Sequence, residues 1–228
     1  MMVIRSEKLR NTIKYALPFA VIPAVTIAGS MLISEKRHLF VSLGVTLLSL
    51  LLFYAGVERR DIGTRRMVGV SVMSAFAIFG RLLPYFKPVT AITTISAIYF
   101  GPEAGFLVGS LSAFLSNFYF GQGPWTAFQM LALGLIGFFA GLLGKSLKAS
   151  RPLLLTYGVA SGLAYSFIMD IWTVLWYAGG FDGKLYLAAL TSAVPYTVSY
   201  AFSNFIFLYI LAKPVGRKLE RVRIKYGL

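Results

Sequence analysis

Long apolar stretches repeat along this chain, and short charged or Pro- and Gly-containing breaks separate them. The apolar core of a bilayer takes about 20 helical residues to cross, and in lipid only a helix or a closed barrel satisfies its backbone polar groups. Because 57% of the 228 residues are hydrophobic and only 13% are charged, lipid rather than water surrounds most of the chain. The sequence therefore predicts an all-α, polytopic transmembrane helix bundle.

The breaks divide the apolar sequence into helical segments. When the apolar sequence is partitioned at these breaks into stretches of about one membrane span, it predicts eight helical segments. Their approximate bounds are 15–33, 39–57, 67–83, 89–100, 103–118, 125–143, 153–178 and 185–212. The fourth is short for a full span and could be broken, tilted or re-entrant where protein covers its backbone. The charged break at 58–66 predicts an amino-terminal extension of about two helices, 1–65, and a six-helix core, 66–228.

Positive charge is unevenly distributed between the breaks. The chain carries 22 Lys and Arg and a formal net charge of +14. With a cytoplasmic amino terminus, 17 of the cations lie inside, and the five outside are Lys36, Arg37, Arg81, Lys87 and Lys184. Because cations are retained on the cytoplasmic side, this predicts a multi-pass cell-membrane protein with both termini cytoplasmic.

The same distribution argues against a nucleic-acid partner, since the cations flank apolar spans rather than form a basic face. The basic tail after Lys213 is interpreted as an anchor that sets topology. Binding of membrane lipid headgroups or of a partner is an added role that the tail could have.

Few residues could support catalysis or metal binding. The chain has no cysteine and His38 is its single histidine, so we expect neither thiolate chemistry nor a metal site. Asp170 is the one carboxylate deep in a predicted span, and without a histidine or nucleophile beside it a membrane enzyme is disfavoured. No Gly-x-x-x-x-Gly-Lys loop is present, so ATP-driven transport would need ATPases on other subunits. We expect no catalytic residue and no covalently bound cofactor.

Small residues recur at helical spacing in three places. They are Gly101, Gly105, Gly109 and Ala113; Gly134, Gly137 and Gly141; and Gly158 and Gly162. Such ladders let helices approach closely and predict internal packing contacts. A shorter pair, Ser71 and Ala75, lies on the helix after the basic break and could instead face a partner subunit.

Polar side chains in predicted spans are expensive to place in lipid and therefore mark candidate functional residues. Asp170 lies about 12 Å below the outer end of its helix by helical rise. It must be protonated, paired with Arg81 or Lys87, or exposed to a wet cavity, and either a helix-fixing contact or a ligand contact would explain it. Arg81, Tyr85 and Lys87, beside two prolines, predict the rim of an external pocket.

Two further groups of side chains converge on the same outer half of the bundle. In the hairpin at 116–129 they are amides and an indole that could bind a neutral, amide-rich ligand, namely Asn117, Gln122, Trp125 and Gln129. On the last two spans they are aromatic, namely Trp172, Tyr196 and Tyr200. Taken alone, aromatics at helical spacing are usually core residues, but their convergence with the amides predicts a ligand site that opens outward.

The sequence resembles the substrate-binding S component of energy-coupling-factor (ECF) vitamin transporters, over about residues 66–228. The resemblance rests on Phe86-Lys87-Pro88-Val89, on Phe100-Gly101-Pro102-Glu103-Ala104-Gly105, and on Gly121-Gln122-Gly123-Pro124-Trp125-Thr126. The last motif and the basic segment 218–228 look like a narrower, cobalamin-specific branch. The extra amino-terminal helices depart from the family pattern.

The resemblance implies a non-catalytic subunit that binds a vitamin on the outer face, with cobalamin expected and riboflavin, folate or pantothenate as alternatives. It also implies docking on a transmembrane coupling subunit with two cytoplasmic ATPases, which use the ATP, and toppling to release the vitamin inside. Family docking uses an Ala-x-x-x-Ala pattern, which here reads Ser71-Val72-Met73-Ser74-Ala75. From the residues alone, a stand-alone proton-coupled carrier or channel with Asp170 as its relay stays open.

Overall fold

The computed structural model describes residues 6–32, 38–56, 60–84 and 86–226, and every regular element in these residues is helical. The elements are α1 (Glu7–Ala16), the π-helical turn η1 (Leu17–Val21), α2 (Ile22–Leu32), α3 (His38–Ala55), α4 (Arg60–Arg81), α5 (Val89–Phe100), α6 (Pro102–Phe120), α7 (Thr126–Leu142), α8 (Gly144–Ala149), α9 (Arg151–Ala178) and α10 (Gly183–Tyr226). The predicted all-α fold is confirmed.

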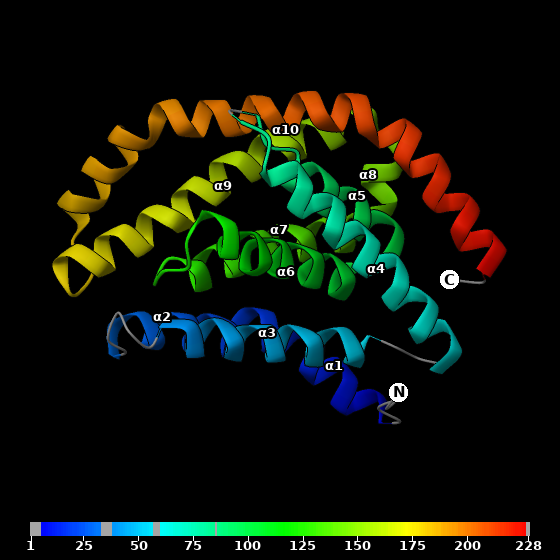
Figure 1. Cartoon of the computed structure of the whole chain (residues 1–228), viewed down its shortest axis with the longest axis horizontal. Helices are drawn as coiled ribbons and strands as arrows, with labels where there is room; N and C mark the ends of the chain where they lie inside the picture. The colour runs from blue at the N-terminus through cyan, green and yellow to red at the C-terminus, as the bar shows by residue number, and fades with distance from the viewer. Residues whose placement is uncertain (1–5, 33–37, 57–59, 85, 227–228) are drawn as a thin grey trace.

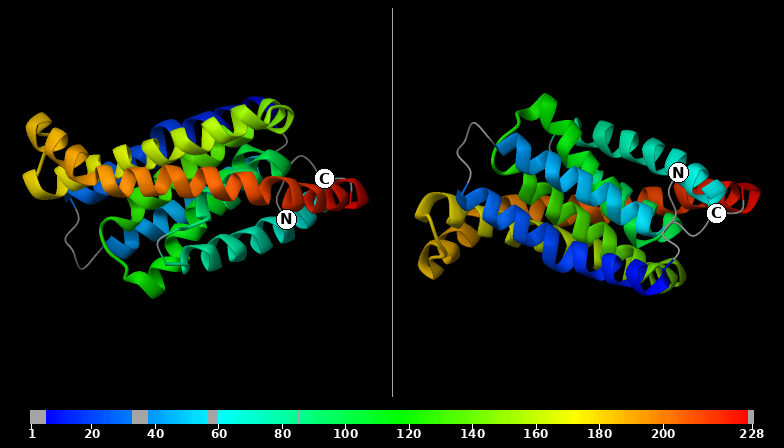
Figure 2. Two further views of the ribbon diagram at one scale, coloured as in Figure 1. Left: turned by 90° about the horizontal axis from the view of Figure 1, so that it is seen from above. Right: turned by 90° about the horizontal axis from the view of Figure 1, so that it is seen from below.

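The helices form three layers (Figure 1). α2 and α3 make one outer layer, α6 and α7 lie in the middle, and α9 and α10 cover the opposite side, with α4 and α5 packed along the bundle. Fully buried aromatic side chains fill the space between the layers, among them Phe53, Phe106 and Phe138. Both termini lie at one end, whereas the α6–α7 hairpin and the α9–α10 turn lie at the other (Figure 2).

Several helices have the length and composition of membrane spans. Four segments of the described chain are long and apolar enough to cross a bilayer, namely Glu7–Met31, α3, α9 and α10. α5 and α7 are shorter apolar helices, and α5 coincides with the short segment predicted at 89–100. This architecture is that of a polytopic membrane helix bundle.

α10 continues beyond the predicted end of the last span and runs to Tyr226. Lys, Arg, Glu and Leu favour a helix, and two basic residues in the last turn complement the negative end of its dipole. Val215 and Leu219 pack against the core, so the basic tail also has an apolar face. Pro195 and Pro214 lie within the helix, which membrane helices tolerate when neighbouring groups compensate the lost backbone bond.

The small-residue ladders lie where helices pack most closely. A Cβ atom on Gly105 would lie 2.5 Å from the carbonyl oxygen of Gly137, and one on Gly109 would lie 2.3 Å from that of Leu133. Both clashes involve backbone atoms, which cannot move aside without separating α6 from α7. Gly162 of α9 meets the backbone of α10 in the same way. The predicted packing role is confirmed for these glycines.

A buried carboxylate joins the amino-terminal helices to the rest of the bundle. Glu103, 4% exposed at the start of α6, pairs with Lys14 of α1 at 3.0 Å and with Arg66 of α4 at 3.1 Å. Arg66 also donates to the carbonyl oxygens of Phe100 at 2.7 Å and Gly56 at 2.8 Å. One carboxylate therefore connects α1, α4 and α6.

Candidate ligand-binding site

The hairpin between α6 and α7 is fixed by side-chain hydrogen bonds. The Gln122 amide donates to the carbonyl oxygen of Phe114 at 2.8 Å. The Thr126 hydroxyl oxygen accepts from the backbone N–H of Gly123 at 3.2 Å and from the Asn117 amide at 2.9 Å. These bonds close the Gly- and Pro-rich loop onto the ends of both helices.

Arg81, the last residue of α4, ties this helix to α6 and α7. Its guanidinium donates to the Ser116 hydroxyl at 2.7 Å, to the Gln129 side-chain oxygen at 2.8 Å and to the carbonyl oxygen of Ala113 at 3.2 Å. The same Gln129 oxygen accepts from the Asn117 amide at 2.8 Å. We call Arg81, Ser116, Asn117 and Gln129 the buried network.

The position of Arg81 differs from the predicted external rim, because the side chain is only 6% exposed. A buried guanidinium is costly unless several acceptors surround it, and α6 and α7 supply them. Among the described residues, Arg81 forms no ion pair with a carboxylate. Within the part of the chain that the structure describes, the network therefore holds a buried positive charge that has no carboxylate partner.

An open cavity of about 500 Å³ lies beside this network, against α10. It is lined by Lys87, Pro195, Tyr196, Ser199, Tyr200 and Ser203. The Lys87 ammonium lies 4.9 Å from the ring centroid of Phe120, and its backbone carbonyl accepts from the Ser203 hydroxyl at 3.2 Å. Burial, together with the charge of Arg81, lowers the pKa of the Lys87 amino group.

Two tyrosines connect the cavity to the buried network. The rings of Tyr200, on the cavity wall, and Tyr165 of α9 lie 5.0 Å apart between centroids. Tyr165 is 6% exposed, and its hydroxyl interacts with the side chains of Tyr200 and Gln129. A ligand in the cavity would therefore contact Tyr200, which is linked through Tyr165 to Gln129 of the buried network.

An aromatic cluster with an acid nearby forms the remaining part of the outer half. Trp125 and Trp172 pack edge to face at 5.9 Å, and Trp172 stacks on Trp176 at 6.2 Å. Asp170 is 8% exposed and forms no ion pair with Arg81 or Lys87. Neither the Oδ2 atom of Asp170 nor the indole N–H of Trp172 has a hydrogen-bond partner in the described part of the chain.

The structure thus places the predicted residues in three adjoining groups. Arg81, Asn117 and Gln129 form the network, Lys87, Tyr196 and Tyr200 line the cavity, and Trp125 and Trp172 pack together near Asp170. Gln122 holds the hairpin, and Tyr85 lies outside the described residues. Within the described residues, no group of three or more His, Asp or Glu side chains could hold a metal ion.

Sequence reasoning missed several residues that complete these groups. Ser199 and Ser203 line the cavity with Tyr196 and Tyr200, at the three- and four-residue spacing of one helix face. Tyr165 precedes Trp172 by seven residues, which is two helical turns on the same face. The helical spacing of these small and aromatic residues relative to the predicted site residues is the sequence signal that could have identified them.

A comparison with protein-family models identifies the type of protein. The model described as "ECF-type riboflavin transporter, S component" matches residues 61–221, well over half of the chain. The chain belongs to the ECF S-component family. S components are substrate-binding membrane subunits of vitamin importers, not enzymes, and they work with a membrane coupling subunit and two ATPases.

This S component is similar to two UPF0397 proteins. A UPF0397 protein of Clostridium perfringens strain SM101 is 25% identical over 189 residues, covering 75% of this chain and 97% of the relative. A second UPF0397 protein, from C. perfringens strain ATCC 13124, matches with the same identity and coverage. No solved structure matches the chain.

The face of α4 that carries Ser71 and Ala75 lies on the outside of the bundle. Ser71 and Ala75 are both exposed, and large apolar side chains flank them, namely Val68, Val72, Phe76 and Phe79. The Ser71 hydroxyl donates to the carbonyl oxygen of Met67 at 2.9 Å, so its polar group is already satisfied within the helix. This face can therefore pack against lipid or another apolar helix.

Proposed function

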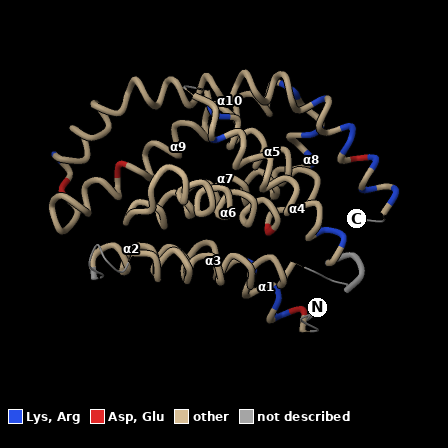
Figure 3. Tube along the Cα trace, in the orientation of Figure 1, with Lys and Arg blue, Asp and Glu red and all other residues tan. Residues whose placement is uncertain are grey.

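We propose that this S component captures a vitamin in the cavity beside Lys87 and Tyr200, in an orientation with both termini cytoplasmic. Lys and Arg gather at the end of the bundle that carries the termini (Figure 3), as the positive-inside rule expects for a cytoplasmic end. The cavity then lies toward the outer half. The observation that carries the proposal is the convergence of α4, α6, α7 and α10 on one network and cavity.

The side chains in and beside the cavity indicate which class of ligand it can bind. Lys87 is a cation of the lining, and Arg81 lies in the buried network beside the cavity. Neither has a carboxylate partner among the described residues, which favours a neutral, electron-rich or anionic ligand. The Tyr200 ring can pack on a flat ring, while Ser199 and Ser203 can hydrogen-bond a polar substituent. A heteroaromatic vitamin with a hydroxylated or charged side chain fits this set.

Riboflavin is the first ligand to test. It is a flat heterocycle with a polyol chain, and the matching family model is described by this vitamin. The cavity of about 500 Å³ lies within the usual range of small-molecule sites, about 300–1,000 Å³. The family description favours a flavin, and the cavity volume is compatible with a ligand of that size.

Cobalamin is the second ligand, supported by the resemblance of the 121–126 hairpin to a cobalamin-specific branch. Asn117 and Gln129 are engaged in the buried network, so they would not face corrin amides without rearranging. The open side of the cavity is accessible, whereas the Gln122 side-chain oxygen has no partner among the described residues but is buried, so the hairpin would have to open before this oxygen could bind a corrinoid. A corrinoid would therefore lie across the hairpin as well as the cavity.

Transport would follow from the family's assembly. We infer that residues 66–228 form the substrate-binding core, that the face of Ser71 and Ala75 docks on the coupling subunit, and that toppling releases the vitamin inside. In this proposal residues 1–65 are an extension of that core, and the ion pair between Lys14 and Glu103 links its first described helix to the core. ATP is consumed by the two partner ATPases.

A binding titration of the purified chain against riboflavin, cobalamin, folate and pantothenate tests the proposal. We expect one vitamin to bind in micromolar or tighter range without ATP, and Tyr200→Ala to weaken it at least tenfold. Tyr177→Ala, at an exposed position outside the cavity, is the matched control. No binding of any vitamin, or equal losses in both variants, would contradict a site at this cavity.

One further measurement separates the importer from a proton-coupled carrier, for which Asp170, whose Oδ2 atom has no hydrogen-bond partner among the described residues, is the expected relay. Cells that carry the S component without its ATPases should show no uptake. Uptake that persists there and collapses with the proton gradient would favour the carrier.

A further inference from the structure

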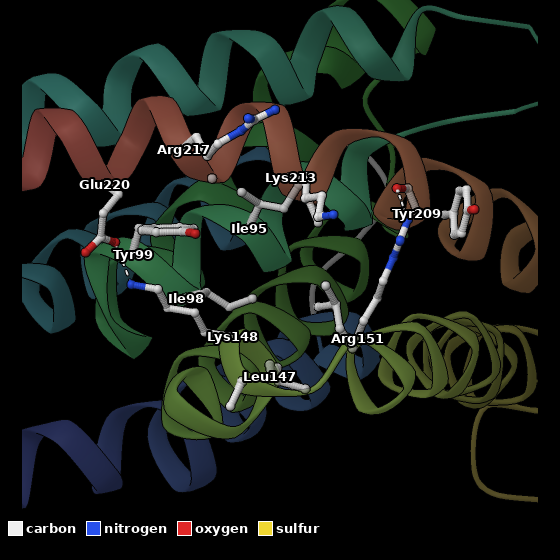
Figure 4. A pocket seen from close by; sticks show the side chains of 14 residues that line it. Ile95, Ile98, Tyr99, Leu147, Lys148, Arg151, Tyr209, Lys213, Arg217 and Glu220 are labelled. Carbon is white, nitrogen blue, oxygen red and sulfur yellow. Dashed lines mark hydrogen bonds and ion pairs between the residues drawn. The ribbon is translucent and has the colours of Figure 1, made fainter.

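We propose that a second cavity, nearer the end that carries the termini, binds a phosphate group, that of an anionic lipid headgroup. The cavity has a volume of about 370 Å³ and lies between α5, α8, α9 and α10 (Figure 4). It shares no lining residue with the vitamin cavity. This site goes beyond vitamin capture and does not depend on it.

The floor of this cavity is apolar. Ile95 and Leu147 are each 1% exposed and Leu154 is 6% exposed, and Ile98 lies beside them. Such a floor offers a free phosphate ion nothing to bind, but it can take the glycerol and first acyl carbons of a lipid. The floor therefore favours a ligand with an apolar part.

Four cations line the cavity against a single carboxylate, that of Glu220. This carboxylate is already engaged, because the Lys148 ammonium lies 2.6 Å from it and also 5.2 Å from the ring centroid of Tyr99. The only acid on the wall thus neutralises one cation and leaves three without a countercharge in the lining.

Arg151 is positioned by its neighbour across the cavity. Its guanidinium carbon lies 4.1 Å from the ring centroid of Tyr209, and the group donates to the Tyr209 carbonyl oxygen at 3.2 Å. Arg151 is also the first residue of the 28-residue helix α9, whose positive dipole end adds to the local potential. A guanidinium held in this way keeps donors available for an anion.

Lys213 completes the site from α10. It has no hydrogen-bond or ion-pair partner within the residues that the structure describes. In Figure 4 its ammonium and the Arg151 guanidinium extend into the same open space, whereas Arg217 turns away. Two like charges above an apolar floor repel each other, and a shared phosphate would convert this repulsion into two charge-assisted hydrogen bonds.

A lipid source agrees with the position of the cavity. Its walls are the ends of three helices next to the basic segment of α10, where a membrane surface begins if the termini are cytoplasmic. Basic pockets between transmembrane helices on that side are typical sites for anionic lipid headgroups.

The test measures binding of phosphatidylglycerol to the delipidated full chain in neutral detergent, by native mass spectrometry and by thermal stabilisation. Arg151→Gln and Lys213→Gln should each weaken binding about fivefold. A cation near an anionic lipid surface contributes about 1 kcal/mol, which corresponds to about a fivefold change in affinity. The double variant should lose about 25-fold. Lys145→Gln, which removes an exposed cation of α8 outside the lining, should have little effect.

Three results would overturn the proposal: wild-type protein that binds phosphatidylcholine equally well, variants that bind like wild type, or a loss in Lys145→Gln equal to that in Lys213→Gln. Glycerol phosphate that competes at low millimolar concentration with the same cation dependence would keep the phosphate site but overturn the lipid as its source. Unchanged vitamin affinity in every variant shows that the bundle is intact and keeps this test separate from the vitamin site.

Discussion

Glu103→Gln would remove the buried carboxylate that connects α1, α4 and α6 while keeping nearly the same side-chain volume. Removing one partner of a buried ion pair typically costs about 3–5 kcal/mol. Here Arg66 retains two carbonyl acceptors, and the Lys14 side chain is 27% exposed and can reach solvent. We therefore expect the free energy of unfolding to fall by about 2–3 kcal/mol, below the full value for a buried pair.

The measurement is thermal unfolding of the purified chain in detergent. For a chain of this size each kcal/mol lowers Tm by about 2–4 °C, so the expected decrease is about 4–12 °C. Glu220→Gln is the matched control, because its partner Lys148 and the carboxylate itself have side chains that are 44% and 34% exposed. Such a surface pair contributes only about 0–1 kcal/mol.

The reasoning fails if Glu103→Gln lowers Tm no more than Glu220→Gln does. A second comparison locates the effect. Lys14→Gln alone should cost less than Glu103→Gln, because the carboxylate keeps Arg66, and adding Lys14→Gln to Glu103→Gln should cost little more. Fully additive losses would show that the two side chains do not act as a pair.

Three further outcomes are expected. Gly137→Ala should reduce the yield of folded protein, since its Cβ would lie 2.1 Å from a backbone oxygen, whereas Gly44→Ala, with nothing within 4 Å, should be neutral in the same expression assay. Lys87→Gln should weaken vitamin binding about tenfold in a titration, and Lys184→Gln, on the exposed start of α10, should not. Ser71→Trp should abolish copurification of the coupling subunit while leaving vitamin affinity unchanged, and retained copurification would exclude docking at this face.

Much of the fold could be predicted because membrane spans depend on local sequence. The bounds of α5 coincide with the prediction because Pro88 and Gly101 flank an apolar run, and proline and glycine end helices for local reasons. The helical continuation of α10 was missed because hydropathy detects apolar segments, not a basic helix with one apolar face. Val215 and Leu219 reveal that face only once their packing against the core is known.

The site could be predicted less completely, because sequence gives depth along a helix but not the direction of a long side chain. Arg81 lies near the end of α4 as expected, yet its guanidinium turns inward to acceptors 35 and 48 residues away. Asn117 and Gln129 lie close together in the hairpin, but the Asn117 amide donates to the side chains of Gln129 and Thr126 within the protein. Their roles depend on long-range contacts that spacing does not encode.

α10 forms a wall of both cavities, from Pro195 to Ser203 at one and from Tyr209 to Glu220 at the other. Tyr200 and Lys213 are separated by 13 residues, or about 20 Å along a helix. The two sites have separate linings, but they share this helix, so a ligand that tilted or rotated α10 at one cavity would also change the shape of the other. Thermodynamic linkage makes any such coupling reciprocal. If a bound headgroup changes the binding free energy of the vitamin, the bound vitamin changes the binding free energy of the headgroup by the same amount.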